Sequence, residues 1–578
     1  MKQASFAVGA LTSVDQPADT GERSRDRERS HYLGLPLLLG LVAISLGWIA
    51  TRPIAALTPD SIQYMSAAQN LNAGRGFVTT VTALESAEPS APFLDWPPLY
   101  PILLSFGTGS PTVAGGLPAA PIRWARWLNL LLLGLSFVPL AALAATMLGR
   151  RAVVPILAFY AFFRPIQVVH SFAWSEGLFI ATTLASMAAM VLSLGGARPR
   201  LQRTIWLVVA GLAAGAAAST RYLGIVVIAA GALTIVTCTA SRHGRHTARR
   251  LGLFLAPSAL PILAWLARNY ELSGSFFGQG RAPSSLDAEQ VLLQILGTAA
   301  ADWLRPPAFS TAALSHAASA VSILAALVLA ASAVRRFGPE TLESSRGRMT
   351  GVTMALSFIG LYLLVISISA LRVGFDPINT RLLAPLYPPM LLVLGAFIRG
   401  AYHDRATGGR ERAFLKASVL VLLTLNAAAS ARWATGPRED RNMSWPYWRS
   451  VKMGETRWER SPLIAAARGL PGDALILSNV WEAVAMHAGK PAKPLPSKAD
   501  PGWPETILRH RGAYALVQGG YRDDLIGLAE LERIREGTTV LEPLVTDGGS
   551  CLYRIVHSTP ESPRSPEPRM ATAPIAPV

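Results

Sequence analysis

Long apolar stretches separated by short polar segments dominate the chain from residue 32 to about residue 431. Most of them are long enough, at about 1.5 Å of rise per residue, to cross a hydrocarbon layer of about 30 Å as a helix. The pattern predicts about eleven membrane spans and therefore a polytopic, mainly α-helical membrane bundle rather than a soluble globular protein. The expected spans are 33–52, 123–147, 152–168, 173–195, 204–219, 222–240, 251–267, 312–333, 351–370, 382–400 and 414–431.

The regions outside this membrane domain, residues 32–431, have a different composition. Residues 1–31 are rich in Arg, Asp, Glu and Ser and lack the apolar core of a signal peptide, which predicts a disordered cytoplasmic tail. Between 432 and 557 the apolar runs shorten to strand length and alternate with helix-like stretches, which predicts a small α/β domain. Residues 558–578 are rich in Pro and are expected to form a second disordered tail.

The positive charge of the chain indicates its topology. The sequence has 53 Lys and Arg against 36 Asp and Glu, a formal net charge of +17. The Arg clusters fall in the N-terminal tail and after every second span, so all of them are expected on the cytoplasmic side. The extracytoplasmic face then carries the loops 53–122, 268–311 and 371–381 and the α/β domain. Because the clusters lack interleaved aromatic residues, no nucleic-acid partner is expected.

The first extracytoplasmic loop, residues 53–122, holds the richest set of polar side chains. Thr58 is a candidate N-cap, Pro59 suits the first helical position and Gly74 suits a helix stop, so a helix of about fifteen residues is predicted between them. Asp60 then lies in the first turn, with Tyr64 one turn further on the same face. The spacing alone fits two interpretations: an acid that complements the helix dipole, or a base placed for chemistry.

Charged residues also occur at the extracytoplasmic ends of later spans. Glu176 opens the fourth span, where an acid pairs with an arginine, orients an acceptor or faces the lipid headgroups. Arg221 lies between the fifth and sixth spans, and Arg372 and Arg381 flank the loop before the tenth. Each guanidinium is suited either to binding a phosphate through its planar fork or to snorkelling toward the membrane surface.

Aromatic residues accompany these charges. Trp96 and Tyr100 follow the predicted helix in the first loop. Their rings suit either stacking on a sugar or prenyl chain, or the aromatic belt that membrane proteins place at the interface. The acids of the first loop, Asp60, Glu85, Glu88 and Asp95, are spaced in a way that neither requires nor excludes a divalent metal, so no metal or other cofactor is predicted.

The order of several short motifs resembles a known family. An Asp just after the first span and a Tyr four residues later are followed by motifs in the first loop, at the start of the fourth span, between the fifth and sixth spans and before the tenth. These are Asn-Leu at 70–71, Gly-Arg-Gly-Phe at 74–77, Trp-Pro-Pro-Leu-Tyr-Pro at 96–101, Trp-Ser-Glu at 174–176, Thr-Arg-Tyr-Leu-Gly at 220–224 and Asp-Pro-Ile-Asn-Thr-Arg-Leu-Leu-Ala-Pro-Leu-Tyr-Pro-Pro at 376–389. Together they resemble bacterial GT-C glycosyltransferases of the protein O-mannosyltransferase and aminoarabinose transferase superfamily, including its rhizobial lipopolysaccharide relatives.

This resemblance implies a GT-C enzyme of the bacterial inner membrane. Such an enzyme transfers a sugar from a polyprenyl-phosphate carrier in the membrane lipid to an acceptor on the periplasmic face, with inversion at the anomeric carbon. Asp60 matches the general base of the family, and Ser61 departs from the second acid of the mannosyltransferase branch, which favours the looser bacterial group. The candidate substrate-binding residues are Tyr64, Trp96, Tyr100, Glu176, Arg221, Arg372, Arg381 and Tyr387. The motifs do not specify the sugar or the acceptor, which is a lipid, glycan or protein.

Two other functional classes remain open on the sequence. A transporter or flippase for lipid-linked saccharides would need ionisable residues near mid-bilayer to couple its movement, and the expected spans contain almost none. A non-catalytic membrane subunit whose extracytoplasmic domain binds cell-wall material is the third interpretation, for which Ser61 leaves room.

Overall fold

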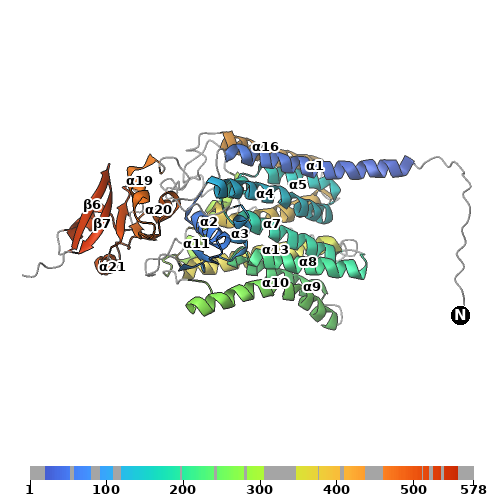
Figure 1. Cartoon of the computed structure of the whole chain (residues 1–578). Coiled ribbons are helices and arrows are strands. Elements are labelled where there is room, and N and C mark those ends of the chain that lie inside the picture. Colours follow the sequence, from blue (N-terminus) through green and yellow to red (C-terminus); the bar gives the residue numbers. More distant parts are fainter. Residues whose placement is uncertain are drawn as a thin grey trace, which may run out of the picture.

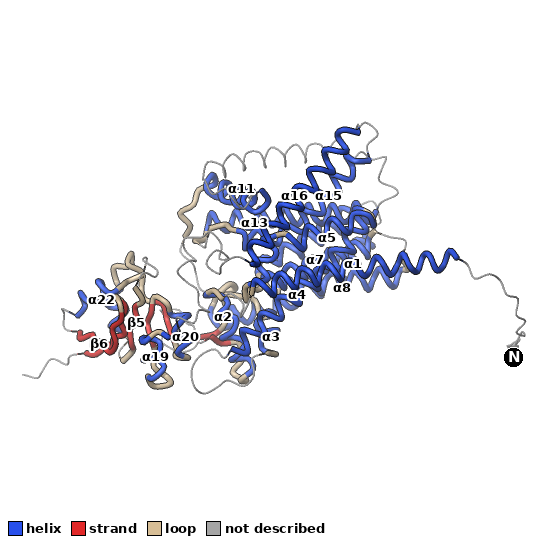
Figure 2. The backbone as a smooth tube through the Cα atoms, turned by 90° about the horizontal axis from the view of Figure 1, so that it is seen from above, coloured by secondary structure: helices blue, strands red, loops and turns tan. Residues whose placement is uncertain are grey.

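The protein forms a long helical bundle with a separate sheet domain beyond one end (Figure 1). The computed structural model describes residues 20–51, 57–79, 91–107, 119–195, 198–239, 244–278, 283–304, 346–374, 377–403, 409–435, 458, 460–510, 512–519, 525–535 and 539–557. The N-terminal end of α1 points away from the bundle at the end opposite the sheet domain (Figure 2). The expected fold class, a mainly helical membrane bundle with a small C-terminal α/β domain, is confirmed.

Long apolar helices build the bundle. Among the described residues, seven helices are long and apolar enough to cross a membrane, or eight if one bent pair counts as a single span. Every expected span overlaps a helix except 312–333, which lies outside the described residues. The bundle helices are α1 (Thr20–Ala50), α4 (Ala119–Leu148), α5 (Arg150–Phe162), α6 (Arg164–Ser171), α7 (Glu176–Leu194), α8 (Arg200–Ala218), α9 (Ile225–Thr239), α10 (Gly244–Ser273), α13 (Arg346–Arg372), α15 (Tyr387–His403) and α16 (Gly409–Thr435).

The bundle exposes apolar side chains on its outside as well as burying them inside. Leu260 and Leu263 on α10 and Leu131 and Leu135 on α4 are all exposed. A soluble protein with so much exposed apolar surface would aggregate, whereas lipid accommodates it. Because lipid offers no hydrogen-bond partners, the backbone must satisfy its own polar groups, which a helix does.

Two boundaries differ from the sequence prediction. The helix α1 begins at Thr20, so residues 20–31 are helical rather than part of a disordered tail. Arg and Glu are frequent there and are strong helix formers, so the membrane helix continues beyond its apolar part. The span expected at 152–168 consists of α5 and α6, which meet at 53°. Pro165 in the first turn of α6 accounts for this break, because proline lacks a backbone N–H.

The first loop folds into α2 (Pro59–Asn72), the two-stranded pair β1 (Val78–Thr79) and β2 (Ala91–Pro92), and α3 (Leu99–Ser105). The predicted cap and stop of the first helix are confirmed, with Thr58 as N-cap and Gly74 at a φ of 74° just after the helix. The helix is buried on most of its sides by other parts of the protein. The reason is that α3 and β1 of the same loop pack against it and a second layer of protein covers a further side.

That second layer is the C-terminal domain. It holds a five-stranded sheet in the order β4-β3-β5-β7-β6, in which β3 is parallel to both β4 and β5 and the pairs at β7 are antiparallel. One of the short apolar runs in this region, residues 514–517, forms the strand β5. The elements are α19 (Pro462–Gly469), β3 (Ile476–Ser478), α20 (Trp481–Ala488), β4 (Ala492–Pro494), α21 (Trp503–Arg509), β5 (Tyr514–Val517), α22 (Leu528–Arg535), β6 (Thr539–Asp547) and β7 (Ser550–His557).

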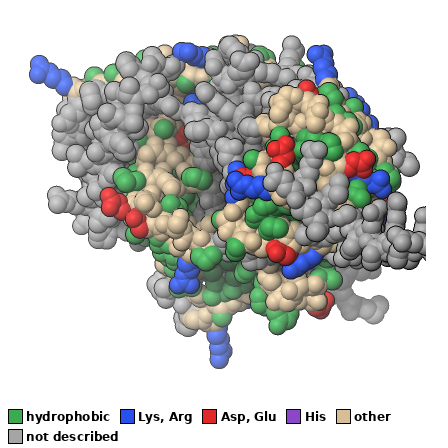
Figure 3. Space-filling view, turned by 90° about the vertical axis from the view of Figure 1, so that its left-hand side faces the viewer, with side chains coloured by type: hydrophobic (Ala, Val, Ile, Leu, Met, Phe, Trp, Pro, Cys, Tyr) green, Lys and Arg blue, Asp and Glu red, His purple; other side chains and the backbone are tan. Residues whose placement is uncertain are grey.

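One apolar cluster joins this domain to the first loop. Ile62 and Met65 of α2 share a buried cluster with Val484 of α20 and Ile476 of β3. Burial of such side chains stabilises the contact by about 25 cal/mol per Å² of apolar area. On the described part of the face seen in Figure 3, charged side chains of both signs are scattered among apolar ones. The C-terminal domain therefore docks through apolar packing, and it covers the helix that carries Asp60.

Candidate functional site

The start of α2 is fixed by hydrogen bonds that reach across to the bundle. Thr58 donates its backbone N–H to Ser61 Oγ at 3.1 Å, and Trp174 donates its indole N–H to Thr58 Oγ1 at 2.7 Å. Ser61, which stands where one branch of the resembled family has a second acid, thus takes part in capping the helix. Asp60 lies between Thr58 and Ser61 in the sequence. Its side chain is 26% exposed, so a substrate can reach it.

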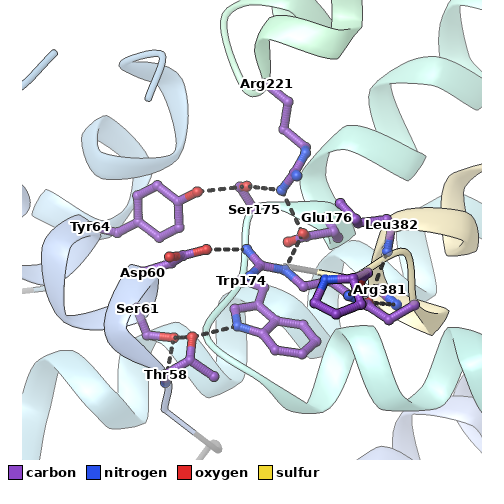
Figure 4. A network of polar contacts seen from close by, with 12 residues as sticks. Thr58, Asp60, Ser61, Tyr64, Trp174, Ser175, Glu176, Arg221, Arg381 and Leu382 are labelled. Atoms are coloured by element: carbon purple, nitrogen blue, oxygen red, sulfur yellow. Dashed lines mark hydrogen bonds and ion pairs between the residues drawn. The ribbon is translucent and has the colours of Figure 1, made fainter. Parts of the chain in front are cut away.

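Asp60 is the exposed end of a chain of ion pairs (Figure 4). Its Oδ2 lies 2.6 Å from Nη2 of Arg381, and the Nε of Arg381 lies 2.5 Å from Oε1 of Glu176. The same glutamate oxygen lies 2.5 Å from Nη1 of Arg221. These four residues come from α2, α7, the turn between α8 and α9, and α14 (Thr380–Leu383), which are far apart in the sequence. Two carboxylates and two guanidinium groups therefore balance in formal charge.

Glu176 is the hub of this network. Its side chain is only 1% exposed and holds both arginines through one oxygen, while Oε2 is buried without a hydrogen-bond partner among the described residues. Removal of one partner of a buried ion pair costs about 3–5 kcal/mol, because the remaining charge is left uncompensated. The sequence left open whether Glu176 pairs with an arginine or faces the lipid headgroups. In the structure it pairs with two arginines.

The guanidinium of Arg381 is held on its flat face as well as at its edges. Its Cζ lies 4.5 Å from the centre of the Trp174 ring, and that ring stacks on Phe172 at 4.0 Å. At the backbone, Asn379 caps α14 by accepting from the N–H of Arg381 at 2.8 Å. A planar group fixed on one face and two edges is suited to present its remaining N–H donors in a set direction.

Tyr64 joins the same network through Ser175. The two hydroxyl groups are 3.2 Å apart, and Ser175 Oγ also accepts from Arg221 Nη1 at 3.2 Å. Complete burial, followed by the nearby charge of Asp60, raises the pKa of the Tyr64 phenol well above its usual value. Tyr64 therefore stays a neutral hydroxyl, able to donate or accept a hydrogen bond beside the carboxylates.

An aromatic wall stands behind Tyr64. The ring centres of Trp96 and Tyr100 lie 5.6 Å and 5.2 Å from that of Tyr64, both edge to face. Tyr100 is fully buried, and its hydroxyl accepts from Asn129 Nδ2 at 2.9 Å, while the same amide donates to the carbonyl of Phe172 at 2.7 Å. Asn129 thus links the first loop to the turn that carries Trp174 and Glu176.

The turn that places Arg221 depends on close approach of the backbone. Gly224 follows Arg221 in the short 3₁₀ turn η1 (Tyr222–Gly224), and a Cβ at this position would overlap the backbone of Ala217 and Ala218. Only glycine permits this contact without a shift of one helix. The glycine of the Thr-Arg-Tyr-Leu-Gly motif at 220–224 therefore allows the tight turn that places Arg221 beside Glu176.

Two further candidate residues belong neither to the ion-pair network nor to the aromatic wall beside Tyr64. Arg372 is exposed at the end of α13, and its backbone carbonyl accepts from the N–H of Ser284 at 3.3 Å. Tyr387 is buried and donates its hydroxyl to Asp302 rather than to a member of the network. Asp376 of the same motif lies outside the described residues. Within the part of the chain that is described, no three His, Cys, Asp or Glu residues cluster as a metal site.

Sequence reasoning did not identify Ser175, Asn129 or Asp302 as parts of this region. Ser175 could have been found as the middle residue of the Trp-Ser-Glu motif. Asn129 is a polar residue inside an apolar span, which is a recognised signal for a buried hydrogen bond. Asp302 is likewise an acid among apolar residues, but the sequence does not identify its partners Thr380 and Tyr387, which follow about 80 residues later.

Comparison with known proteins places the fold. No protein-family model matches the sequence, and no curated protein matches it. Among solved structures, ArnT from Cupriavidus metallidurans bound to undecaprenyl phosphate is similar over 90% of this chain and 98% of its own, with 13% identity and a TM-score of 0.56. The apo state of the same protein has 14% identity and a TM-score of 0.56.

A second similar structure is the oligosaccharyltransferase from Archaeoglobus fulgidus in the apo form. It has 12% identity and a TM-score of 0.52, and the match covers 84% of this chain and 69% of the archaeal chain. Identities this low carry the fold and not the activity. The match includes nearly all of ArnT, so the bundle and the C-terminal domain are shared together. The chain is therefore a multi-pass membrane protein with the GT-C fold of the aminoarabinose transferase ArnT.

Proposed function

We propose that this protein is a membrane glycosyltransferase that moves a sugar from a polyprenyl-phosphate carrier to an acceptor hydroxyl. The observation that carries the proposal is the direct contact between Asp60 and Arg381, a partly exposed carboxylate beside a fixed guanidinium. Sugar transfer from a phosphate needs both groups, a base for the acceptor and a cation for the departing phosphate. Support for a lipid carrier comes from ArnT, whose structure holds undecaprenyl phosphate.

In the proposed reaction, the donor phosphate binds the N–H groups of Arg381 and displaces Asp60 from its ion pair. Asp60 is then free to take the proton of the acceptor hydroxyl. The acceptor oxygen forms the new bond to the anomeric carbon, while the bond from that carbon to the phosphate oxygen breaks. The polyprenyl phosphate leaves with the electron pair. A single displacement of this kind inverts the anomeric carbon.

The remaining members of the network have supporting roles in this proposal. Glu176 keeps Arg381 and Arg221 in place after Asp60 has turned to the acceptor, so the two cations do not repel each other uncompensated. Arg221 is 15% exposed and adds positive charge near the departing phosphate. Tyr64 and Trp96 form one wall beside the base. No step in this scheme requires a metal or another cofactor.

The test is an analysis of lipid-linked sugars in cells that lack the protein. We expect one intact polyprenyl-phosphate sugar to accumulate on the extracytoplasmic leaflet, because its acceptor reaction is missing. Wild-type protein should clear it and release free polyprenyl phosphate. Accumulation on the cytoplasmic leaflet would instead support a flippase, and an unchanged lipid profile would support a non-catalytic subunit.

We also propose that the site and the C-terminal domain face the periplasm, with the protein in a bacterial inner membrane. The proposal rests on the Arg-rich loops, which lie at the opposite ends of the helices that reach the site. Reporter fusions after Arg250 and after Arg348 should read as cytoplasmic, and fusions near residue 90 and after Arg460 as extracytoplasmic. Opposite readings for the last two positions would contradict a common face for the first loop and the C-terminal domain.

A further inference from the structure

A stripe of polar side chains runs along one face of α11 (Ala288–Leu304), the helix that follows α10. Gln294, Thr298 and Asp302 occur at every fourth position, so they lie above one another on the same side of the helix. The sequence of this region is otherwise mostly apolar, and Leu292 and Leu293 are 54% and 48% exposed. Three regularly spaced polar residues in such a helix need partners on the protein side.

All three side chains bind one segment, residues 378–387. The backbone N–H of Ile378 donates to Gln294 Oε1 at 2.8 Å, and Thr298 Oγ1 donates to the carbonyl of Ile378 at 3.0 Å. Asp302 Oδ1 accepts from Thr380 Oγ1 at 2.8 Å, and its Oδ2 accepts from the hydroxyl of Tyr387. The bonds therefore begin three residues before Arg381 and end six residues after it.

Besides these bonds, the backbone of the segment is held by Asn379, which accepts from the N–H of Arg381 at 2.8 Å, and by Tyr362, whose hydroxyl donates to the carbonyl of Leu382 at 2.8 Å. The segment consists of the one-turn helix α14, the 3₁₀ turn η3 (Ala384–Leu386) and the first residue of α15. Two short turns in succession do not form a rigid element by themselves. Arginine also has a long side chain that loses much rotamer freedom when it is fixed. The direction of its guanidinium therefore depends on what holds the backbone of Thr380 and Arg381.

We propose that Gln294, Thr298 and Asp302 are positioning residues that hold Arg381 in the geometry needed to receive the donor phosphate. This inference rests on the proposed function, and it gives α11 a role in the reaction without contact to substrate. It also assigns Tyr387 a role: the tyrosine is an anchor of the Arg381 segment through Asp302. A shift of about 1 Å in a group that binds the reacting phosphate is enough to slow a reaction about 100-fold.

The decisive experiment combines substitutions at Asp302 and Arg381 in the full-length protein. Asp302→Ala should lower kcat for sugar transfer about 10- to 100-fold, as loss of an outer positioning partner commonly does. In an Arg381→Ala background, the same change should have no further effect, because it acts through Arg381. The proposal is overturned if the losses in kcat from Asp302→Ala and Arg381→Ala multiply in the double variant. It is also overturned if Asp302→Ala alone keeps the wild-type kcat.

Two further variants separate positioning from loss of folding. Asp302→Asn keeps an oxygen that accepts from Thr380, so it should recover much of the activity lost in Asp302→Ala. Gln290 lies one turn before Gln294 on the same face, and its side chain bonds to the N–H of Asp287 within the start of α11. Gln294→Ala should therefore reduce kcat while Gln290→Ala does not. Equal losses in both glutamine variants would indicate a general weakening of α11.

Hydrogen exchange provides a readout that does not depend on sugar transfer. Asp302→Ala should speed exchange of the backbone amides in residues 378–387 without changing those of α7, because only that segment loses its anchor. If the wild-type protein transfers no sugar but this exchange difference is present, the proposed function fails while the anchoring by α11 stands. If exchange in the segment is unchanged, the anchoring itself is refuted.

Discussion

Asp60→Asn should lower sugar transfer by about two to four orders of magnitude, because the amide cannot take the proton of the acceptor hydroxyl. Asparagine has nearly the same size and still offers an oxygen to Nη2 of Arg381, now 2.6 Å from the carboxylate. The loss of charge at the helix start and in this contact should cost about 1–2 kcal/mol of unfolding free energy. The protein should therefore insert and melt nearly as the wild type does.

The measurement is turnover of a polyprenyl-phosphate sugar by the purified variant, alongside its melting temperature. Glu289→Gln is a matched control, since Glu289 is also an acid in the first turn of a helix but is exposed on α11, outside the network. Its turnover should equal that of the wild type. Equal turnover in both variants would leave Asp60 as an acid that complements the helix dipole, and the proposed reaction would lose its base.

The sequence predicts the local part of this arrangement well. Thr58, Pro59 and Gly74 mark the limits of α2 because capping and turn chemistry depend on neighbouring residues alone. The long apolar stretches likewise predict the bundle, since hydropathy is a local property. The start of α1 at Thr20 was missed because charge is a poor guide to where a helix ends in water.

The residues of the site could be predicted from the sequence, but the contacts between them could not. The resemblance named Asp60, Glu176, Arg221 and Arg381, yet nothing local indicates that one oxygen of Glu176 would hold both arginines. Those contacts arise from the packing of three helices and the turn between α8 and α9, which the hydrophobic pattern does not specify. The role of α11 was missed for the same reason: its polar stripe is meaningful only beside a segment about 80 residues away.

The second large effect should come from Arg381→Lys. Arginine reaches Glu176 with Nε and Asp60 with Nη2 at the same time, at 2.5 Å and 2.6 Å, while its flat face covers Trp174. Lysine has one nitrogen and no flat face, so it keeps the charge but not this bridged geometry. Sugar transfer should fall about 10² to 10³-fold, the range seen when one fixed donor to a developing negative charge is removed.

A matched control is Arg348→Lys, the same change at an arginine whose Nε donates to the carbonyl of Met147 at 3.1 Å, near the start of α13. Both variants should insert normally, and Arg348→Lys should keep wild-type turnover. The proposal also predicts how the loss is divided: kcat should fall more than the affinity for the carrier, because charge on the phosphate grows as it departs. Full turnover in Arg381→Lys would mean that a point charge suffices. A fall confined to carrier affinity would place Arg381 in ground-state binding and leave the departing phosphate to Arg221.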